Sequence, residues 1–188
     1  VLEAKKHPIV MSNRWSRATE GRESSVSADV GDAMKEIFAF LTEKKVKKCA
    51  LYAINPSSMA DECRRQAFLA SGGEDRDVFY NRGSLEDCFC ALHGKKNDYD
   101  AIICSNDFAA ISLIRHFALK GESLEGVYIV SYSDTLLARC TTPSVSTVSV
   151  DYKSFGELAL FIADGLSRCP AAGSIHALAR WELKHRET

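Results

Sequence analysis

Polar side chains that could recognise a small molecule gather where two buried strands are predicted to end. Ala101–Cys104 is a continuous apolar run of strand length, and it stops at a polar cluster that contains Asn106. A second apolar run, residues 127–130, stops at a cluster that contains Ser133. Parallel strands bring their carboxyl ends to one edge of a sheet, and ligands bind at that edge in open α/β proteins. An amide and a hydroxyl both donate and accept hydrogen bonds, so the pattern predicts recognition of a polar ligand.

An enzyme is the competing interpretation of the same clusters. Asp107 and Asp134 could form an acid/base pair, but helix capping or turn roles explain both positions. No phosphate-binding loop, nucleophile elbow or zinc-protease motif occurs, and Gly72-Gly73 is typical of a helix stop. The histidines are scattered without metal-ligand spacing, at positions 7, 93, 116, 176 and 185. We therefore predict a binding protein without catalytic residues, metal or other cofactor.

The composition narrows the class of partner. The 188 residues are 46% hydrophobic and carry a formal net charge of -1, which predicts one globular domain or two lobes without a nucleic-acid footprint. No apolar run approaches the roughly 20 residues of a membrane span.

The seven cysteines form no C-x-x-C pair, and several lie in apolar patterns. Reduced thiols and a cytoplasmic location are expected, with a secreted disulfide framework as the alternative.

Strands alternate with helices through the middle of the chain. Apolar runs of strand length are predicted at Cys49–Ile54, Val78–Tyr80, Ala101–Cys104 and 127–130. Helical faces lie between them, and the side chains expected to cap the helices are Asp29, Ser84, Asp107 and later Asp151. Such alternation predicts a doubly wound α/β fold with a parallel sheet and right-handed crossovers.

The two ends of the chain are less regular. A short strand at residues 8–11 and a polar loop at 15–25 precede the first helix, and we expect the chain to begin partway through a longer protein. After residue 130 the pattern predicts an irregular stretch over 136–143, weak alternation over 144–150, a helix after Asp151 and a last strand over 177–183.

Several motifs occur in a family-specific order. They are Tyr99-Asp100-Ala101-Ile102 with Asn106-Asp107, then Tyr132-Ser133-Asp134-Thr135, then Thr142-Pro143-Ser144-Val145-Ser146-Thr147-Val148, and the closing Arg186-Glu187-Thr188. In this order the chain resembles, from about Pro8 onward, the effector-binding region of LacI/GalR-type transcriptional regulators, whose fold is that of type I periplasmic sugar-binding proteins.

The resemblance implies two α/β lobes joined by three crossovers, with the effector bound between the lobes. By this reading residues 1–28 are a remnant of the first lobe and residues 29–149 a nearly complete second lobe. Residues 150–176 return to the first lobe, and 177–188 form a final strand of the second. Most of the first lobe and the DNA-binding headpiece are then absent from this sequence, and the region also forms homodimers in the family.

The resemblance also implies ligand-binding positions. Asn106 matches an amide that binds effector hydroxyls, and Arg64 matches the arginine of an Arg-x-x-Gly-Phe motif in which Ala67 here replaces glycine. Asn13 and Tyr152 match a polar and an aromatic cleft position. Three of these positions have a simpler alternative: a helix cap for Asn106, surface charge for Arg64, and packing at a helix start for Tyr152.

Ser133 departs from the family, whose typical members carry an acidic residue there. Without that acidic residue, the charge of the Arg64 guanidinium is left uncompensated, provided that neither Asp134 nor Glu62 turns inward. A sugar acid or sugar phosphate is then expected rather than a neutral sugar, because a guanidinium binds carboxylate and phosphate through paired hydrogen bonds.

Three functions of the chain are compatible with these features. The first is the effector-binding, dimerising part of a bacterial repressor or activator whose small-molecule effector is a sugar, sugar acid or sugar phosphate, and we favour it. The alternatives are a periplasmic solute-binding protein of the same fold and an enzyme. We expect that the chain alone does not bind operator DNA, because it lacks a recognition helix, and that it self-associates through apolar faces at residues 8–11 and 155–166.

Overall fold

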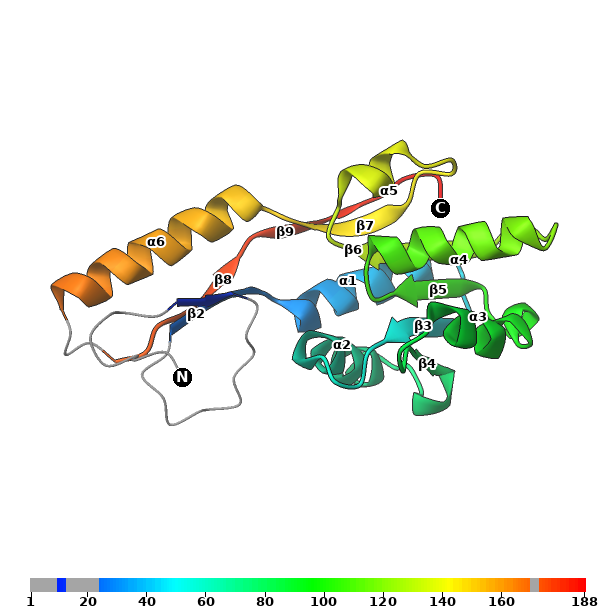
Figure 1. Cartoon of the computed structure of the whole chain (residues 1–188), viewed down its shortest axis with the longest axis horizontal. Coiled ribbons are helices and arrows are strands. Elements are labelled where there is room, and N and C mark those ends of the chain that lie inside the picture. The colour runs from blue at the N-terminus through cyan, green and yellow to red at the C-terminus, as the bar shows by residue number, and fades with distance from the viewer. Residues whose placement is uncertain (1–9, 13–23, 170–172) are drawn as a thin grey trace. The chain divides into compact units, whose positions relative to one another are not determined.

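The chain forms two compact units. The computed structural model describes residues 10–12, 24–169 and 173–188 (Figure 1). Unit 1 comprises residues 1–29 and 150–181, and unit 2 comprises residues 30–149 and 182–188. Each unit has its own sheet and its own hydrophobic core.

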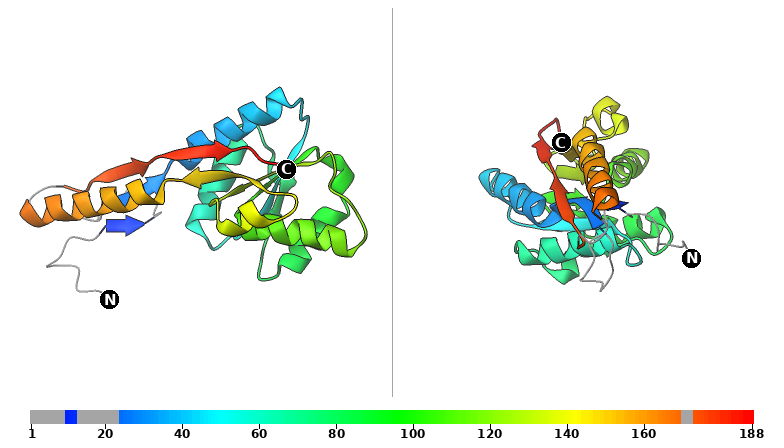
Figure 2. Two further views of the ribbon diagram at one scale, coloured as in Figure 1. Left: turned by 90° about the horizontal axis from the view of Figure 1, so that it is seen from above. Right: turned by 90° about the vertical axis from the view of Figure 1, so that its left-hand side faces the viewer.

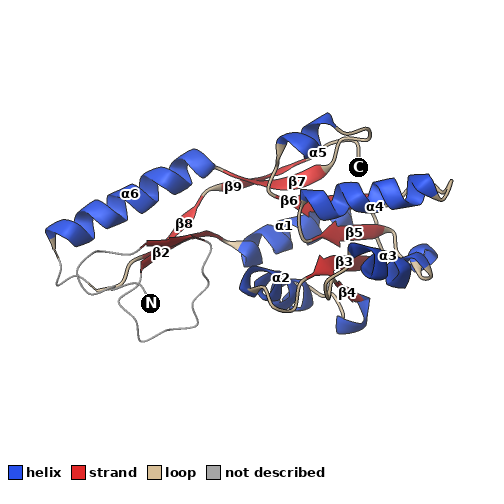
Figure 3. Ribbon diagram, in the orientation of Figure 1, coloured by secondary structure: helices blue, strands red, loops and turns tan. Residues whose placement is uncertain are grey.

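Unit 2 is built on a six-stranded sheet (Figure 3). Its strands, in spatial order, are β4 (Val78–Tyr80), β3 (Cys49–Ile54), β5 (Ala101–Cys104), β6 (Tyr128–Tyr132), β7 (Ser146–Val150) and β9 (Trp181–Lys184). Neighbouring strands from β4 to β7 pair in parallel. The predicted parallel α/β sheet is therefore confirmed, because each strand returns over a helix before it pairs.

Helices cover both faces of this sheet. They are α1 (Val30–Glu43), α2 (Met59–Ala70), α3 (Leu85–His93), α4 (Asp107–Leu119) and the short α5 (Leu136–Cys140). Ile102 and Cys104 of β5 pack with α3 and α4 in one apolar cluster, while the alternate residue Ile103 points to the other face. Figure 2 shows α1 and α4 on opposite sides of the sheet. A strand buried on both faces explains the unbroken apolar run at Ala101–Cys104.

Side-chain oxygens fix where the helices begin. Ser84 accepts a hydrogen bond from the backbone N–H of Asp87 at the start of α3, and Asp151 accepts from two N–H groups at the start of α6 (Tyr152–Arg168), as predicted. The prediction that Asp107 caps α4 is wrong. Asn106 does so, accepting from the N–H of Ala109 at 2.9 Å.

Three predicted segments have a different structure. Residues 136–143, expected to be irregular, contain helix α5. The loop expected over 15–25 overlaps strand β2 (Ser24–Ala28), which begins at Ser24. The sequence of β2 is mostly polar, yet four of its five residues are buried. The single strand expected over 177–183 is two strands, β8 (His176–Ala179) and β9, because Arg180 interrupts the pairing and its carbonyl accepts a bond from the Asp151 N–H.

Unit 1 has a smaller sheet and one helix. Its strands, in the order β1 (Val10–Ser12), β2 and β8, are parallel. Helix α6 packs on them, and Val26, Ile162 and Ala179 form the buried centre of the contact. The predicted inner face of α6 is thus largely covered by these strands. Leu160 and Phe161, which lie outside that face, are exposed.

Candidate functional site at the carboxyl edge of the sheet

The carboxyl ends of four parallel strands in unit 2 are each followed by a small polar residue. These are Asn55 after β3, Asn81 after β4, Asn106 after β5 and Ser133 after β6. Each asparagine side chain accepts a backbone N–H within its own turn, from Ser57, Gly83 and Ala109 respectively, at 2.9–3.1 Å. Side-chain hydrogen bonds therefore stabilise these three turns. The polar edge expected from the sequence is present in the structure.

Asn106 has a capping role and remains exposed. Its amide oxygen caps α4, while its amide nitrogen donates to the Ser105 hydroxyl at 3.3 Å. The residue lies in extended backbone at the end of a buried strand. The simpler interpretation of Asn106 is thus correct as far as the cap is concerned. The amide nitrogen has a second proton beyond the one donated to Ser105, so a ligand role for Asn106 stays a prediction.

Arg64 comes to the same edge from helix α2. Its Nη1 donates to Oδ1 of Asp61 at 2.6 Å, and Oδ2 of Asp61 accepts the backbone N–H of Asn55 at 3.0 Å. The guanidinium carbon lies 4.9 Å from the centre of the Tyr132 ring, at the end of β6. Arg64 is half-buried rather than a free surface charge, and within the described residues its Nε is buried without a hydrogen-bond partner. Ion pair, stacking and helix together fix the guanidinium in place.

The premise that Arg64 is uncompensated is wrong. Glu62 lies near Arg65 and bonds Gln66, and Asp134 bonds Arg139, so neither of the two acids considered from the sequence turns toward Arg64. Asp61 supplies the charge instead. The sequence carried a signal for this, because residues three apart on a helix are neighbours and Asp61 and Arg64 have that spacing.

Ser133 stands in a strained turn. Its φ is 115° and that of the following Asp134 is 50°, and both lie in the left-handed region that non-glycine residues avoid. The N–H of Ser133 donates to the carbonyl of Val148 at 2.9 Å, which ties the turn to β7. The turn therefore has a fixed shape, and it leaves the Ser133 side chain half-buried at the edge.

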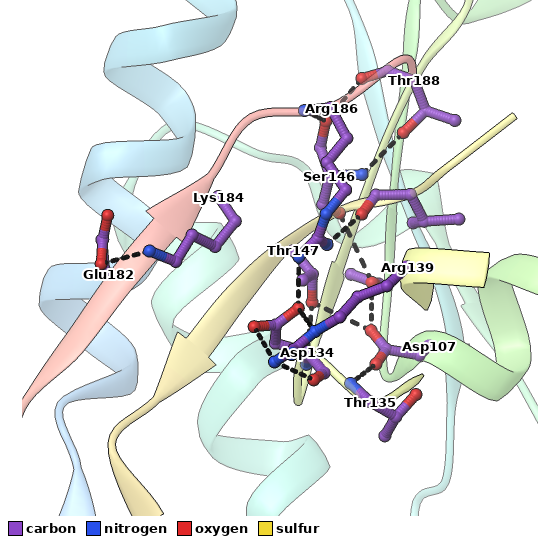
Figure 4. Close-up of polar contacts among 12 residues, drawn as sticks. Asp107, Asp134, Thr135, Arg139, Ser146, Thr147, Glu182, Lys184, Arg186 and Thr188 are labelled. Atoms are coloured by element: carbon purple, nitrogen blue, oxygen red, sulfur yellow. Dashed lines mark hydrogen bonds and ion pairs between the residues drawn. The ribbon is translucent and has the colours of Figure 1, made fainter. Parts of the chain in front are cut away.

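Asp134 is committed to a structural ion-pair network (Figure 4). Its carboxylate accepts from Nη2 of Arg139 at 2.7 Å and from the guanidinium of Arg186. Burial alone would raise the pKa of Asp134, but the hydrogen bonds from Arg139 and Arg186 outweigh it and lower the pKa below its ordinary value. Arg186 also donates to the carbonyl of Val145 at 2.7 Å, so the closing Arg-Glu-Thr motif fastens the chain to the sheet.

Asp107 is buried in a second network (Figure 4). Its carboxylate accepts from the hydroxyls of Ser131 and Thr147 and, at 2.6 Å, from the N–H of Thr135. The carboxylates of Asp107 and Asp134 thus bond different partners, although the Asp134 N–H also donates to the Thr147 hydroxyl, and each carboxylate is occupied in holding strands and turns. This arrangement gives no support to the acid/base pair considered from the sequence.

The remaining predicted positions are Tyr152 and Asn13. Tyr152 belongs to unit 1, where it is the first residue of α6 and has 58% of its surface exposed. Asn13 lies outside the described residues. The structure therefore brings Arg64, Asn106 and Ser133 to one edge of the unit 2 sheet.

The described part of the chain gives no support for a metal site or for a reactive thiolate at Cys49 or Cys88. No group of three or more His, Cys, Asp or Glu side chains there is arranged to hold a metal ion. Burial raises the pKa of the Cys49 and Cys88 thiols to about 11, so both are neutral rather than reactive thiolates near neutral pH. Nor does any helix among residues 10–12, 24–169 and 173–188 have the length and apolarity to cross a membrane.

Two surface hollows lie at the opposite, amino edge of the same sheet. One, of about 270 Å³, is lined by residues that include Lys47, Cys49 and Gly73. The other, of about 350 Å³, is lined by Phe40, Tyr128 and residues 185–188 among others. Neither hollow contains a predicted site residue. Because ligands of open α/β sheets bind outside the carboxyl ends, the Arg64–Asn106–Ser133 edge remains the better candidate.

Solved structures of transcriptional regulators have the same fold at low sequence identity. A LacI transcriptional regulator from a Rhodococcus species matches with a TM-score of 0.83 and 20% identity, over 98% of this chain and 70% of that one. The transcriptional regulator CelR, in complex with cellobiose, matches at 0.78 and 21%, over 95% of this chain and 57% of that one. A LacI family regulator from Enterococcus faecalis V583 with bound ribose matches at 0.80 and 19%, over 98% and 69%.

These matches concern the fold, and they span only part of each regulator. No protein-family model and no curated protein matches the sequence. The chain covers 57% of the length of the CelR regulator. The three proteins named above are transcriptional regulators. The chain thus has the type I periplasmic-binding-protein-like α/β fold of the effector-binding domains of LacI-type regulators.

Proposed function

We propose that the chain is the effector-binding part of a cytoplasmic transcriptional regulator, and that its effector is a small sugar-like molecule. The observation that carries the proposal is the set of Arg64, Asn106 and Ser133 at one carboxyl edge of a parallel sheet. A guanidinium, an amide and a hydroxyl offer donors and acceptors at fixed positions, which is what adjacent sugar hydroxyls require. Regulators of the same fold with cellobiose or ribose bound support the ligand class.

The proposal includes control of DNA binding by the effector. Effector binding favours one conformation of the regulator over another, and a DNA-binding headpiece elsewhere in the protein responds to that shift in population. The chain itself carries a formal net charge of -1, whereas DNA-binding domains are commonly basic. The effector thus acts on DNA affinity through a coupling free energy rather than through direct contact with DNA.

A homodimer is the proposed assembly. Phe108, Leu136 and Leu137 are exposed by 63%, 72% and 57%, although all three are large apolar side chains. They lie in the first turns of α4 and α5, which are held together where the N–H of Thr135 bonds the carboxylate of Asp107. We call these three residues the α4–α5 patch. Exposed apolar patches of this kind commonly mark protein interfaces.

Calorimetry with a carbohydrate panel tests the effector proposal. The panel contains ribose, cellobiose, gluconate and glucose 6-phosphate, and it is applied to the intact protein. Arg64→Ala is expected to weaken binding of the best ligand by about 10–100-fold, the equivalent of 1.5–3 kcal/mol for a hydrogen bond to a charged group. Asn106→Asp is also expected to weaken it, because the variant keeps the capping oxygen and loses the amide donors.

Arg65→Ala is the matched control. Arg65 is the next residue on the same helix and bonds Tyr80 and Asp75 rather than Asp61. Its substitution is expected to leave the affinity unchanged within about threefold. The proposal fails if no carbohydrate binds, or if Arg64→Ala and Asn106→Asp bind as tightly as the parent.

A further inference from the structure

Asp61 and Arg64 form an ion pair at the carboxyl edge of the unit 2 sheet. Both residues lie on α2, one helical turn apart, and Asp61 is 8% exposed. The 2.6 Å contact is a strong charge-assisted hydrogen bond. Asp61 is further fixed by the N–H of Asn55, so its carboxylate cannot swing away without breaking a bond to the end of β3.

The charged groups around this pair are engaged with other partners. Glu62 and Gln66 bond each other on the exposed side of α2, and Arg65 bonds Tyr80. Asp134 bonds Arg139 and Arg186. The Tyr132 ring, which lies under the guanidinium, directs its hydroxyl to the sulfur of Met34 at 3.9 Å. The charge of Arg64 is therefore balanced by Asp61 and by no other acid named here.

A balanced guanidinium selects its ligand differently from a free one. A ligand carboxylate or phosphate bound to Arg64 would lie within a few ångströms of the Asp61 carboxylate, and like charges at that distance repel in a partly buried site. A neutral hydroxyl suffers no such repulsion. It can accept from the guanidinium while the Asp61 bond stays intact.

We infer that Asp61 is a specificity-determining residue: it positions and neutralises Arg64, so that the edge binds a neutral polyhydroxyl ligand and rejects a carboxylate or phosphate. The inference rests on the proposed function and names its ligand class. It also assigns to Asp61, from α2, the charge balance that an acidic residue at position 133 would otherwise supply.

The first test uses inorganic phosphate, so that it does not depend on the identity of the effector. Thermal unfolding of the intact protein is measured in phosphate and in sodium chloride of equal ionic strength. The parent protein is expected to show no phosphate-specific change in Tm. Asp61→Asn frees the guanidinium, and at phosphate concentrations well above Kd it is expected to gain about 3 °C. The gain is expected to disappear in the double variant Asp61→Asn, Arg64→Met.

Glu62→Gln is the matched control, because it removes the neighbouring carboxylate of the same helix and leaves Asp61–Arg64 intact. It is expected to behave as the parent. If Asp61→Asn does not fold, Asp61→Ser removes the same charge and keeps an oxygen that can accept the Asn55 N–H. A phosphate-specific Tm rise in the parent, or none in a folded Asp61 variant, overturns the inference.

The second test compares affinities within the carbohydrate panel. The parent is expected to prefer a neutral sugar, and Asp61→Asn is expected to shift the ratio of gluconate to neutral-sugar affinity by about 10-fold or more toward the anion. A parent that binds gluconate or glucose 6-phosphate more tightly than every neutral sugar contradicts the inference and leaves the proposed function standing. A panel in which nothing binds contradicts the proposed function, while the phosphate result still decides the role of Asp61.

Discussion

At the scale of single residues, Asn106 has the capping role that local sequence predicts for its neighbour Asp107. Asn106 and Asp107 are both good helix caps, and from sequence Asp107 was expected to be the cap of α4. In the structure Asn106 caps the helix, because Asp107 is drawn into the core by the hydroxyls of Ser131 and Thr147 on β6 and β7. Those partners are 24 and 40 residues away in sequence, so no local pattern could reveal them.

The Asp107 network predicts a large loss of stability for a small substitution. Asp107→Asn replaces one accepting oxygen by a donor, which leaves a hydroxyl or the Thr135 N–H without its acceptor inside the protein. We expect a loss of about 2–4 kcal/mol in the free energy of unfolding, measured by urea denaturation. Glu125→Gln, at an exposed position of the same unit, is expected to change it by less than about 0.5 kcal/mol. Equal effects for the two variants would contradict the assigned role.

Asp134 predicts a pH-dependent contribution to stability. Its folded pKa is lowered below the ordinary value of 3.8, so its ion pairs with Arg139 and Arg186 stabilise the protein above pH 3.8 and lose that effect as the pH falls through the folded pKa. The parent is expected to be more stable than Asp134→Asn by about 3 kcal/mol at pH 7. Urea denaturation from pH 7 to pH 2 is expected to show this difference shrinking only below about pH 4. A difference independent of pH would be inconsistent with an ionised Asp134.

At the scale of elements, long periodic segments were predictable and short or polar ones were not. Strand β5 has the predicted bounds, and helix α2 ends at Ala70, just before the glycine stop predicted at Gly72-Gly73. Strand β2 was missed because three of its five residues are serines, buried through pairing with β1 and β8. Helix α5 was missed because it is only five residues long and has no side-chain cap.

The glycine that follows the end of helix α2 gives a prediction at the scale of elements. A Cβ added at Gly73 would lie 2.2 Å from the buried ring of Phe68, so this glycine is required by packing. Gly73→Ala is expected to lower the free energy of unfolding by about 1–3 kcal/mol. Gly94→Ala, where no atom lies within 4 Å of the new Cβ and φ is negative, is the control and is expected to have little effect. Denaturant titration of the two variants measures the difference.

At the scale of the whole molecule, the sequence predicted the parallel α/β sheet and the edge at which polar residues meet, because alternation of strands and helices fixes both. It did not predict the charge of that edge. The ligand argument from Ser133 considered Asp134 and Glu62, whereas Asp61 makes the ion pair with Arg64. The i,i+3 spacing of Asp61 and Arg64 made this pair predictable in principle, but whether an acid turns toward an arginine also depends on side-chain packing.

The α4–α5 patch predicts the assembly. If Phe108, Leu136 and Leu137 form the dimer contact, Leu137→Glu places a charge in an apolar interface and is expected to convert a dimer into a monomer at micromolar concentration. Light scattering coupled to size-exclusion chromatography measures the mass. Leu119→Glu, at a position 73% exposed at the other end of α4, is expected to leave the mass unchanged. A monomeric parent, or a Leu137→Glu variant with the parent's mass, would rule out this interface.

The most direct test of the account locates the ligand on the sheet. Amide hydrogen exchange of the intact protein is measured by mass spectrometry, with and without the panel carbohydrate that raises the Tm most. The account predicts protection at the carboxyl edge, in peptides that contain Asn55 and Arg64, Asn106, and Ser133. Protection confined to the hollows at the amino edge, around Lys47 and Gly73 or around Tyr128 and His185, would contradict it.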